Sequence, residues 1–125
     1  MKVTLNNLIE SKTAQQKKID NKPKDETVKN NLNKTLKFLN SLDWNGEIIV
    51  NSGYRCKELN EAVGGVPSSH HTLGLAADIT TDKLSDFLAV VKARISELDQ
   101  LIYYPKKNFI HISVHPNNRK QYLVK

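Results

Sequence analysis

The sequence predicts an α+β fold in which two main helices pack on a small antiparallel sheet. Two segments have helical periodicity, and several shorter segments alternate apolar and polar side chains or are rich in β-branched residues. The length of 125 residues is enough to bury one core and too short for two. We therefore expect a single domain over residues 1–125.

The first predicted helix spans residues 25–42, and Asp25 stands at its N-cap position. Its apolar residues recur at helical spacing, at Val28, Leu32, Leu36 and Leu39. The stretch before it, up to Pro23, is polar, and KKIDNKPKD (17–25) is expected to be a loop that enters this helix.

The second predicted helix spans residues 83–96, with Thr81 or Asp82 as its cap. Its apolar face consists of Leu84, Phe87, Leu88, Val91 and Ile95. A shorter helix is expected between Cys56 and the glycines at 64–65.

Five segments are predicted as strands: 46–51, 74–80, 99–104, 108–115 and 121–125. On the second strand, alternation directs Leu75, Ala77 and Ile79 to the core and Gly74, Ala76 and Asp78 to the other face. On the fourth strand, the outer face holds Phe109, His111, Ser113 and His115. A face lined by glycine and alanine suggests that another molecule approaches closely there.

The composition is that of an ordinary soluble protein, with 38% hydrophobic and 26% charged residues. No segment is long and apolar enough for a signal peptide or a membrane span, so we expect synthesis in the cytoplasm and no membrane partner. The net charge of +6 attracts polyanions such as nucleic acid, anionic lipid or a bacterial wall. However, the lysines are scattered and lack interleaved aromatic residues, so a nucleic-acid-binding domain finds no motif in support.

Three residues offer the ligand set of a catalytic zinc ion: His71, Asp78 and His111. Two imidazoles and one carboxylate leave a fourth position for water. The single cysteine, Cys56, excludes an internal disulfide and any multi-cysteine zinc site. The alternative is that these are surface histidines and a capped aspartate, because only the fold can bring His111 to the other two.

Four motifs in order resemble the zinc D-Ala-D-Ala metallopeptidases, in particular their compact phage and bacterial branch, whose fold is shared by the hedgehog signalling domain. They are SGYR (52–55), SHHTLGLAAD (69–78), DQLI (99–102) and FIHIS (109–113). The similarity extends to SKTAQQKKIDNKP (11–23), ELNEAVGG (58–65) and NNRKQYL (117–123), so it covers nearly the whole chain.

The resemblance implies that Zn²⁺ is the cofactor and that His71, Asp78 and His111 are its ligands. His71 stands three residues before Gly74, as the motif requires, whereas the adjacent His70 is expected to be an exposed neighbour.

The resemblance also implies that Arg55 binds and polarises the substrate, a role that suits a planar and permanently charged guanidinium. The alternative for Arg55 is a surface salt bridge. Ser69 is also expected to bind the substrate beside Arg55. Ser69 and Ser113 are expected to orient the ligands, the alternative being ordinary polar residues of a turn and a strand.

The carboxylate that such peptidases use as general acid and base is not evident, since no acidic residue follows Asp99. Three residues are candidates for the missing group. Tyr104 shares strand parity with Ile102, Asp99 stands at the strand entry, and His115 shares parity with His111. Each has a structural alternative: packing for Tyr104, strand entry for Asp99 and surface exposure for His115.

We expect a zinc peptidase that cleaves peptidoglycan stem peptides through a metal-activated water, as a D-Ala-D-Ala carboxypeptidase or an endolysin-type endopeptidase. A monomer that acts on the cell wall and is encoded by a phage or prophage fits this expectation. The alternative is a catalytically impaired, zinc-containing wall-binding module, which the missing carboxylate favours.

Overall fold

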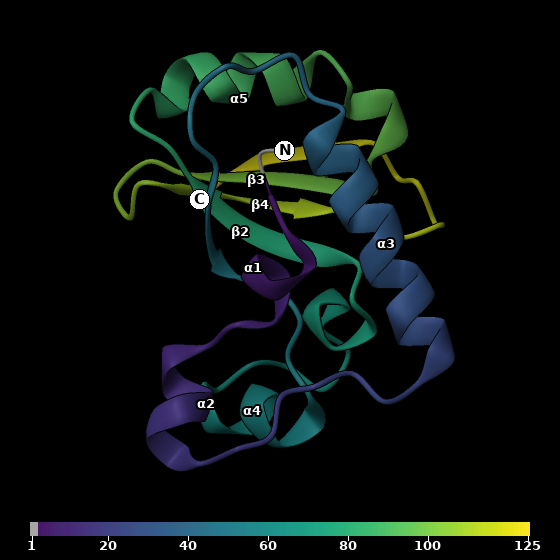
Figure 1. The fold of residues 1–125 in the computed structure, drawn as a ribbon. Helices are drawn as coiled ribbons and strands as arrows, with labels where there is room; N and C mark the ends of the chain where they lie inside the picture. The colour runs from purple at the N-terminus through teal and green to yellow at the C-terminus, as the bar shows by residue number, and fades with distance from the viewer. Residues whose placement is uncertain (1–2) are drawn as a thin grey trace.

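The computed structural model describes residues 3–125 and contains a five-stranded sheet with helices packed around it (Figure 1). The helices are α1 (Leu5–Ile9), α2 (Lys12–Lys17), α3 (Glu26–Asn40), α4 (Lys57–Ala62) and α5 (Leu84–Lys92), with 3₁₀ turns η1 (His70–Leu73) and η2 (Ile95–Glu97). The strands are β1 (Ile49–Ser52), β2 (Ala76–Thr80), β3 (Gln100–Tyr104), β4 (Phe109–Ser113) and β5 (Gln121–Val124). The predicted α+β class is confirmed. No helix among these is both long and apolar enough to cross a membrane.

The strands are arranged in the order β1-β2-β4-β3-β5. Neighbouring strands run antiparallel except β3 and β5, which run parallel, so the prediction of a wholly antiparallel sheet is wrong for the last strand. The reason is topological. Strand β4 is flanked on both sides, so the chain must pass the end of the sheet to reach the outer edge of β3, and it enters that edge from the end at which β3 begins.

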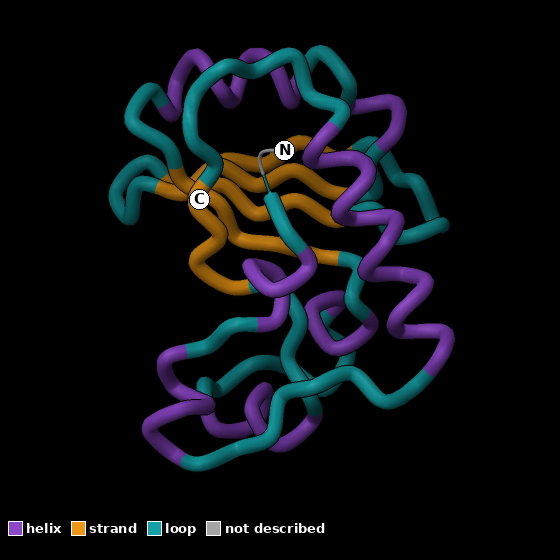
Figure 2. The backbone as a smooth tube through the Cα atoms, viewed as in Figure 1, coloured by secondary structure: helices purple, strands orange, loops and turns teal. Residues whose placement is uncertain are grey.

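One face of the sheet is the core face, and the predicted alternation is confirmed there. Its fully buried side chains include Ala77, Ile79, Leu101, Ile110 and Ile112. They pack with apolar residues of α3 and α5, including Leu32, Leu39, Phe87 and Val91. Figure 2 shows the strands at the centre, with α5 on one side and the α2 and α4 region on the other. The opposite face of the sheet is left for polar side chains.

The caps of the two main helices differ from each other. The Asp25 carboxylate accepts hydrogen bonds from two backbone N–H groups of the first turn of α3, at 2.7 and 3.3 Å, as predicted. Helix α5 begins after Lys83 without any side-chain cap, so the prediction of Thr81 or Asp82 as its cap is wrong. This helix ends at Lys92, and a 3₁₀ turn replaces its predicted last turn.

The N-terminal stretch contains two short helices for which no prediction was made, and the loop predicted at 17–25 is confirmed for residues 18–25. Thr4 and Asn7 form a capping box at α1, and the Ser11 hydroxyl accepts from the backbone of α2. Helices of five and six residues carry almost no periodic apolar signal, so only their caps identify them. Helix α2 and the residues just before it form one wall of the cleft described below.

Candidate metal centre

Asp78 and His111 lie directly opposite each other on the polar face of β2 and β4. His111 Nδ1 is 2.9 Å from Asp78 Oδ1. The two strands are neighbours in the sheet, so residues about 30 positions apart in sequence share one site.

The short turn η1, just before β2, brings His71 to the same carboxylate. His71 is buried, and its Nε2 lies 3.4 Å from Asp78 Oδ1. Its other ring nitrogen, Nδ1, is 2.7 Å from the Gly53 carbonyl oxygen. Because a carbonyl can only accept, Nδ1 donates this hydrogen bond, and Nε2 is the ring nitrogen that faces Asp78.

The three side chains fit a zinc ion. One ligand atom from each of His71, Asp78 and His111 lies within 4.8 Å of the others. Tetrahedral zinc, with bonds of about 2.0–2.1 Å, holds its nitrogen and oxygen ligands about 3.3 Å apart, close to the 3.4 Å between His71 Nε2 and Asp78 Oδ1. The carbonyl bond that orients His71 is of the kind found behind metal-binding histidines.

Asp78 has an electrostatic environment suited to a ligand. Burial raises the pKa of its carboxyl, but hydrogen bonds from His111 and His71 outweigh this effect and hold the pKa well below its usual range. The carboxylate therefore stays ionised. No lysine or arginine of the described chain forms an ion pair with it.

Contrary to expectation, Gly74 does not lie on a strand face that is open to another molecule. It precedes β2 with a left-handed φ of 77°, and a Cβ there would stand 3.0 Å from Leu32 Cγ and the Val28 carbonyl oxygen of α3. Its close backbone contact is thus with α3, which Thr35 reinforces by a 2.7 Å hydrogen bond to the Gly74 carbonyl. Ala76 is almost fully buried. The expectation that these two residues open a strand face to substrate is wrong.

Arg55 and Ser69 adjoin the ligand set. The Ser69 hydroxyl accepts from the His71 backbone N–H at 3.2 Å and from Arg55 Nη2 at 3.4 Å, so it links the arginine to the turn that carries His71. Burial lowers the pKa of Arg55, whereas the charge of Asp78 raises it; at neutral pH the guanidinium remains charged. Its Nε is buried without a hydrogen-bond partner. The guanidinium therefore has unused donor capacity beside the candidate metal ligands.

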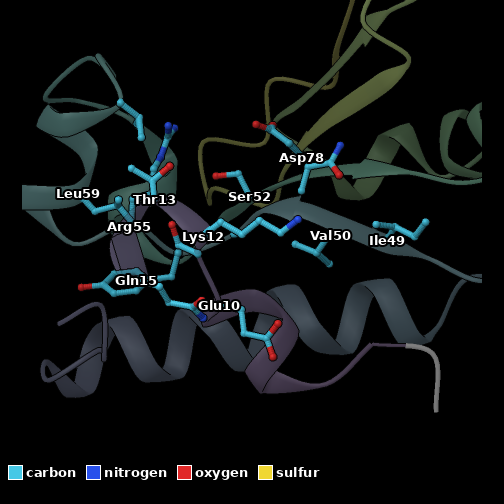
Figure 3. A pocket seen from close by; sticks show the side chains of 15 residues that line it. Glu10, Lys12, Thr13, Gln15, Ile49, Val50, Ser52, Arg55, Leu59 and Asp78 are labelled. Atoms are coloured by element: carbon cyan, nitrogen blue, oxygen red, sulfur yellow. The ribbon is translucent and has the colours of Figure 1, made fainter. Parts of the chain in front are cut away.

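A cleft of about 690 Å³ runs beside the site and includes Asp78 and Arg55 in its lining (Figure 3). One wall is the segment 10–15 at α2, and the other consists of β1 and the turn that follows it. The sequence predicted Arg55 in the second wall but no individual residue of the α2 wall, because the N-terminal similarity covers a segment without any residue of evident chemical role.

The two walls are fastened together by Asn21. Its side-chain amide donates to the carbonyl oxygens of Ile9 and Tyr54, both at 2.9 Å, and its oxygen accepts from the Cys56 backbone at 2.8 Å. These bonds fix the N-terminal segment beside the residues that flank Arg55. The position of the cleft wall is therefore defined by a buried polar side chain.

Tyr104 lies on the polar face with His111. The register pairs Ile102 with His111 and Tyr104 with Phe109, and the Tyr104 and Phe109 rings stack with centroids 4.5 Å apart. Burial, and then the charge of Asp78, raise the pKa of Tyr104. At neutral pH its hydroxyl is therefore protonated and can donate a hydrogen bond.

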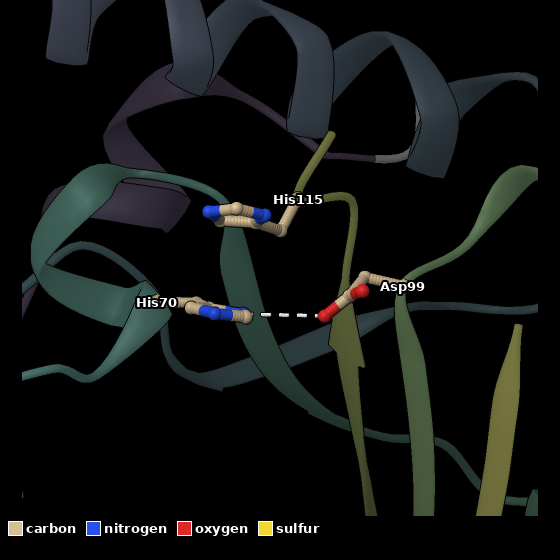
Figure 4. Close-up of side chains that lie close together, drawn as sticks. All are labelled: His70, Asp99 and His115. Atoms are coloured by element: carbon tan, nitrogen blue, oxygen red, sulfur yellow. Dashed lines mark ion pairs between the residues drawn. The ribbon is translucent and has the colours of Figure 1, made fainter. Parts of the chain in front are cut away.

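A second His–Asp–His cluster lies near the end of β4, formed by His70, Asp99 and His115 (Figure 4). The His70 and His115 rings stack at 4.4 Å, and His70 Nδ1 lies 2.6 Å from Ser113 Oγ and 3.8 Å from Asp99 Oδ2. The expectation of an exposed His70 is wrong, because only 19% of its side chain is exposed. Ser113 thus contacts His70 and not a candidate ligand.

Asp99 is fully buried, and both of its oxygens bind Arg119, with Nη2 at 2.9 Å and the backbone N–H also at 2.9 Å. The Arg119 hydrogen bonds outweigh the effect of burial and lower the pKa of Asp99. Asp99 and His115 therefore lie in a different cluster from the candidate zinc ligands. This placement gives no support to either as the missing acid.

Two imidazoles and an ionised carboxylate beside an open cleft form the donor set of a metal-dependent hydrolase. A family model described as Peptidase M15 matches residues 1–113, and the chain belongs to this family. The resemblance seen in the motifs is thereby confirmed. M15 peptidases are zinc-dependent, which supports a metallopeptidase. A search among curated proteins finds no match to the chain.

Proposed function

We propose that the protein is a zinc metallopeptidase that cleaves peptides of bacterial peptidoglycan, as a D-Ala-D-Ala carboxypeptidase or as an endopeptidase of the endolysin type. The observation that carries this proposal is the convergence of His71, Asp78 and His111 in a chain of the M15 family. A zinc ion held there would supply a Lewis acid for the scissile carbonyl and lower the pKa of a water molecule.

Arg55 is the substrate-binding residue in this proposal. Its charged guanidinium lines the cleft, has a buried Nε without a partner and contacts Ser69. A planar fork of N–H donors suits a substrate carboxylate or the negative charge that develops on the scissile carbonyl oxygen. Ser69 orients Arg55 and His71 relative to each other.

Tyr104 supplies a hydrogen bond to the developing oxyanion. Its raised pKa keeps the hydroxyl protonated, so it serves as a donor and not as a base at neutral pH. Its position on the polar face, two pairs along the ladder from His111, supports this role.

A second candidate function is a zinc-containing module that binds the wall without cleaving it. Glu10 and Asp78 are the two carboxylates that line the cleft, and Asp78 belongs to the ligand set. Glu10 is exposed, accepts a hydrogen bond from Asn6 and is directed away from Asp78 in Figure 3. The lack of a carboxylate poised as base favours this second candidate.

The proposed substrate is the stem peptide of peptidoglycan, and the proposed place of action is the bacterial cell wall, where the protein would act as a monomer. M15 membership supports the substrate class. The net charge of +6 suits a wall rich in carboxylates and phosphates. A phage or prophage lysis protein is the proposed origin of such an enzyme.

Metal content and hydrolysis measured on one preparation test the proposal. Elemental analysis should find one zinc ion per chain, and purified peptidoglycan should release new amines in a reaction that a chelator stops. Zinc without release from several wall types would favour the binding module. Absence of both zinc and release would contradict the two candidates together.

A further inference from the structure

The cleft beside the candidate metal centre has a free strand edge as one of its walls. Strand β1 is the first strand of the sheet and pairs only with β2. Among residues 3–125, no backbone hydrogen bond outside the sheet ladder involves residues 49–52. An unpaired edge of this kind is a template for a further strand.

The free edge leads directly to the candidate metal centre. Ser52, the last residue of β1, pairs with Asp78, and the register of β1 is irregular between Val50 and Ser52. Irregularities of this type bend a strand and commonly occur beside active sites. An extended chain laid along the outer edge of β1 would have β1 between itself and β2, and it would come nearest to Asp78 at Ser52, where the cleft also includes Arg55.

The charges of the cleft favour an anionic occupant. Lys12 on the α2 wall and Arg55 on the opposite wall both line the cleft, and neither forms an ion pair within the described part of the chain. In Figure 3 the Lys12 side chain extends from the α2 wall towards β1. Asp78 does not neutralise these cations once it ligates a metal ion.

We propose that the cleft binds an extended peptide as an added strand on the outer edge of β1, with one peptide carboxylate at Arg55 and a second acidic group at Lys12. Main-chain hydrogen bonds to residues 49–52 would supply affinity that does not depend on side chains, and the two cations would select a peptide with two carboxylates. This inference rests on the proposed function, because it assigns the substrate of the same site.

Hydrogen exchange tests the strand edge. The probe is the tetrapeptide L-Ala-γ-D-Glu-L-Lys-D-Ala, added to the zinc-loaded full chain. Amides of residues 49–52 that point outward should exchange about tenfold more slowly when it is bound. A probe with the same charges and N-methylated amides should bind about tenfold more weakly. Binding without protection at 49–52, or equal binding of both probes, would overturn the proposal.

Kinetics test the charge selection. Lys12→Ala should raise KM for a stem pentapeptide about fivefold with kcat unchanged, and Lys12→Arg should restore the original KM. Lys17→Ala, on the same helix and outside the cleft, is the matched control. Equal effects of Lys12→Ala and Lys17→Ala would overturn the role of Lys12. If no variant and no wild-type preparation hydrolyses peptide but β1 is protected on binding, the catalytic proposal fails and the docking proposal stands.

Discussion

The two His–Asp–His clusters near β4 have the same composition but different surroundings. In the first, the Asp78 carboxylate pairs with the imidazoles of His71 and His111, and no lysine or arginine of residues 3–125 forms an ion pair with it. In the second, Asp99 is bonded by three N–H groups of Arg119. A carboxylate whose lone pairs are already occupied by a guanidinium is a poor metal ligand, because binding a cation would require the arginine to leave.

The orientations of the histidine rings also favour the first cluster over the second as a metal site. The His71 and His111 rings are tilted by 58°, whereas the His70 and His115 rings stack at 19°. Imidazole lone pairs lie in the ring plane, so two nearly parallel rings direct them along parallel lines that do not converge on one ion. Residue composition therefore indicates a candidate metal site, and carboxylate partners and ring tilt decide between candidates.

Substitution of the two adjacent histidines should separate the clusters most clearly in zinc affinity. His71→Ala should lower zinc affinity by more than about a hundredfold, because it removes a ligand and not only a supporting group. His70→Ala, the neighbouring control, should retain one zinc ion per chain. Competition with a chromophoric chelator measures both. Equal zinc affinities of the two variants would contradict the assignment of the first cluster.

Arg55 lies beside the first cluster and Arg119 beside the second, and their substitution should affect activity and stability in opposite ways. Arg55→Ala should leave zinc in place and reduce kcat/KM about a hundredfold, because an unpaired donor to the developing charge is lost. It should change the free energy of unfolding little, since no ion pair disappears. Zinc analysis, peptide hydrolysis and urea unfolding on the same samples give the three readings. Unchanged hydrolysis would remove Arg55 from the mechanism.

Arg119→Ala should show the reverse pattern. It leaves the buried Asp99 carboxylate without its main partner and should lower the free energy of unfolding, which appears as a lower urea midpoint than that of the wild type. Zinc content should not change. Lys120→Ala, which removes the neighbouring charge, is the control. Loss of zinc in Arg119→Ala would show that the second cluster supports the first.

The stability difference between wild type and Arg119→Ala should depend on pH. Arg119 lowers the pKa of Asp99 in the folded protein, so the stabilisation is complete above the unfolded-state pKa of about 3.9 and is lost as the pH falls through the lower folded value. The difference should therefore narrow between pH 7 and pH 3. Urea unfolding of both proteins at pH 7 and pH 3 measures this difference in stability. A difference that stays constant with pH would exclude ionised Asp99 as the group that Arg119 stabilises.

Ser113→Ala should change both the stability and the zinc affinity only slightly. The Ser113 hydroxyl is buried and contacts His70 Nδ1 at 2.6 Å, so its loss should cost about 1 kcal/mol of stability. Zinc affinity should change less than threefold, since Ser113 contacts no candidate ligand. A tenfold loss of zinc affinity would mean that the two clusters act as one.

The cluster of His71, Asp78 and His111 could be predicted from the sequence, because strand alternation and the order of the motifs both indicate these residues. Alternation placed Asp78 and His111 on polar faces, and the spacing to Gly74 distinguished His71 from His70. The second cluster had no such signal. It depends on Arg119, which reaches Asp99 through a loop that leads into a parallel last strand, and no local pattern encodes a parallel pairing of this kind. The short N-terminal helices were missed because they depend on caps and on the Asn21 hydrogen bonds.

The hydrogen bonds of Asn21 hold a cleft wall that is separate in sequence from the candidate metal ligands. Residues 10–15 build one cleft wall, yet every candidate metal ligand lies after residue 70. Substitutions in that wall can alter which peptide fits while the ligand set is left intact, provided that Asn21 still holds the wall in place. Substrate preference and metal chemistry can thus change independently, and an engineered change of preference would be confined to residues 10–15, because Leu8 just before them belongs to the core.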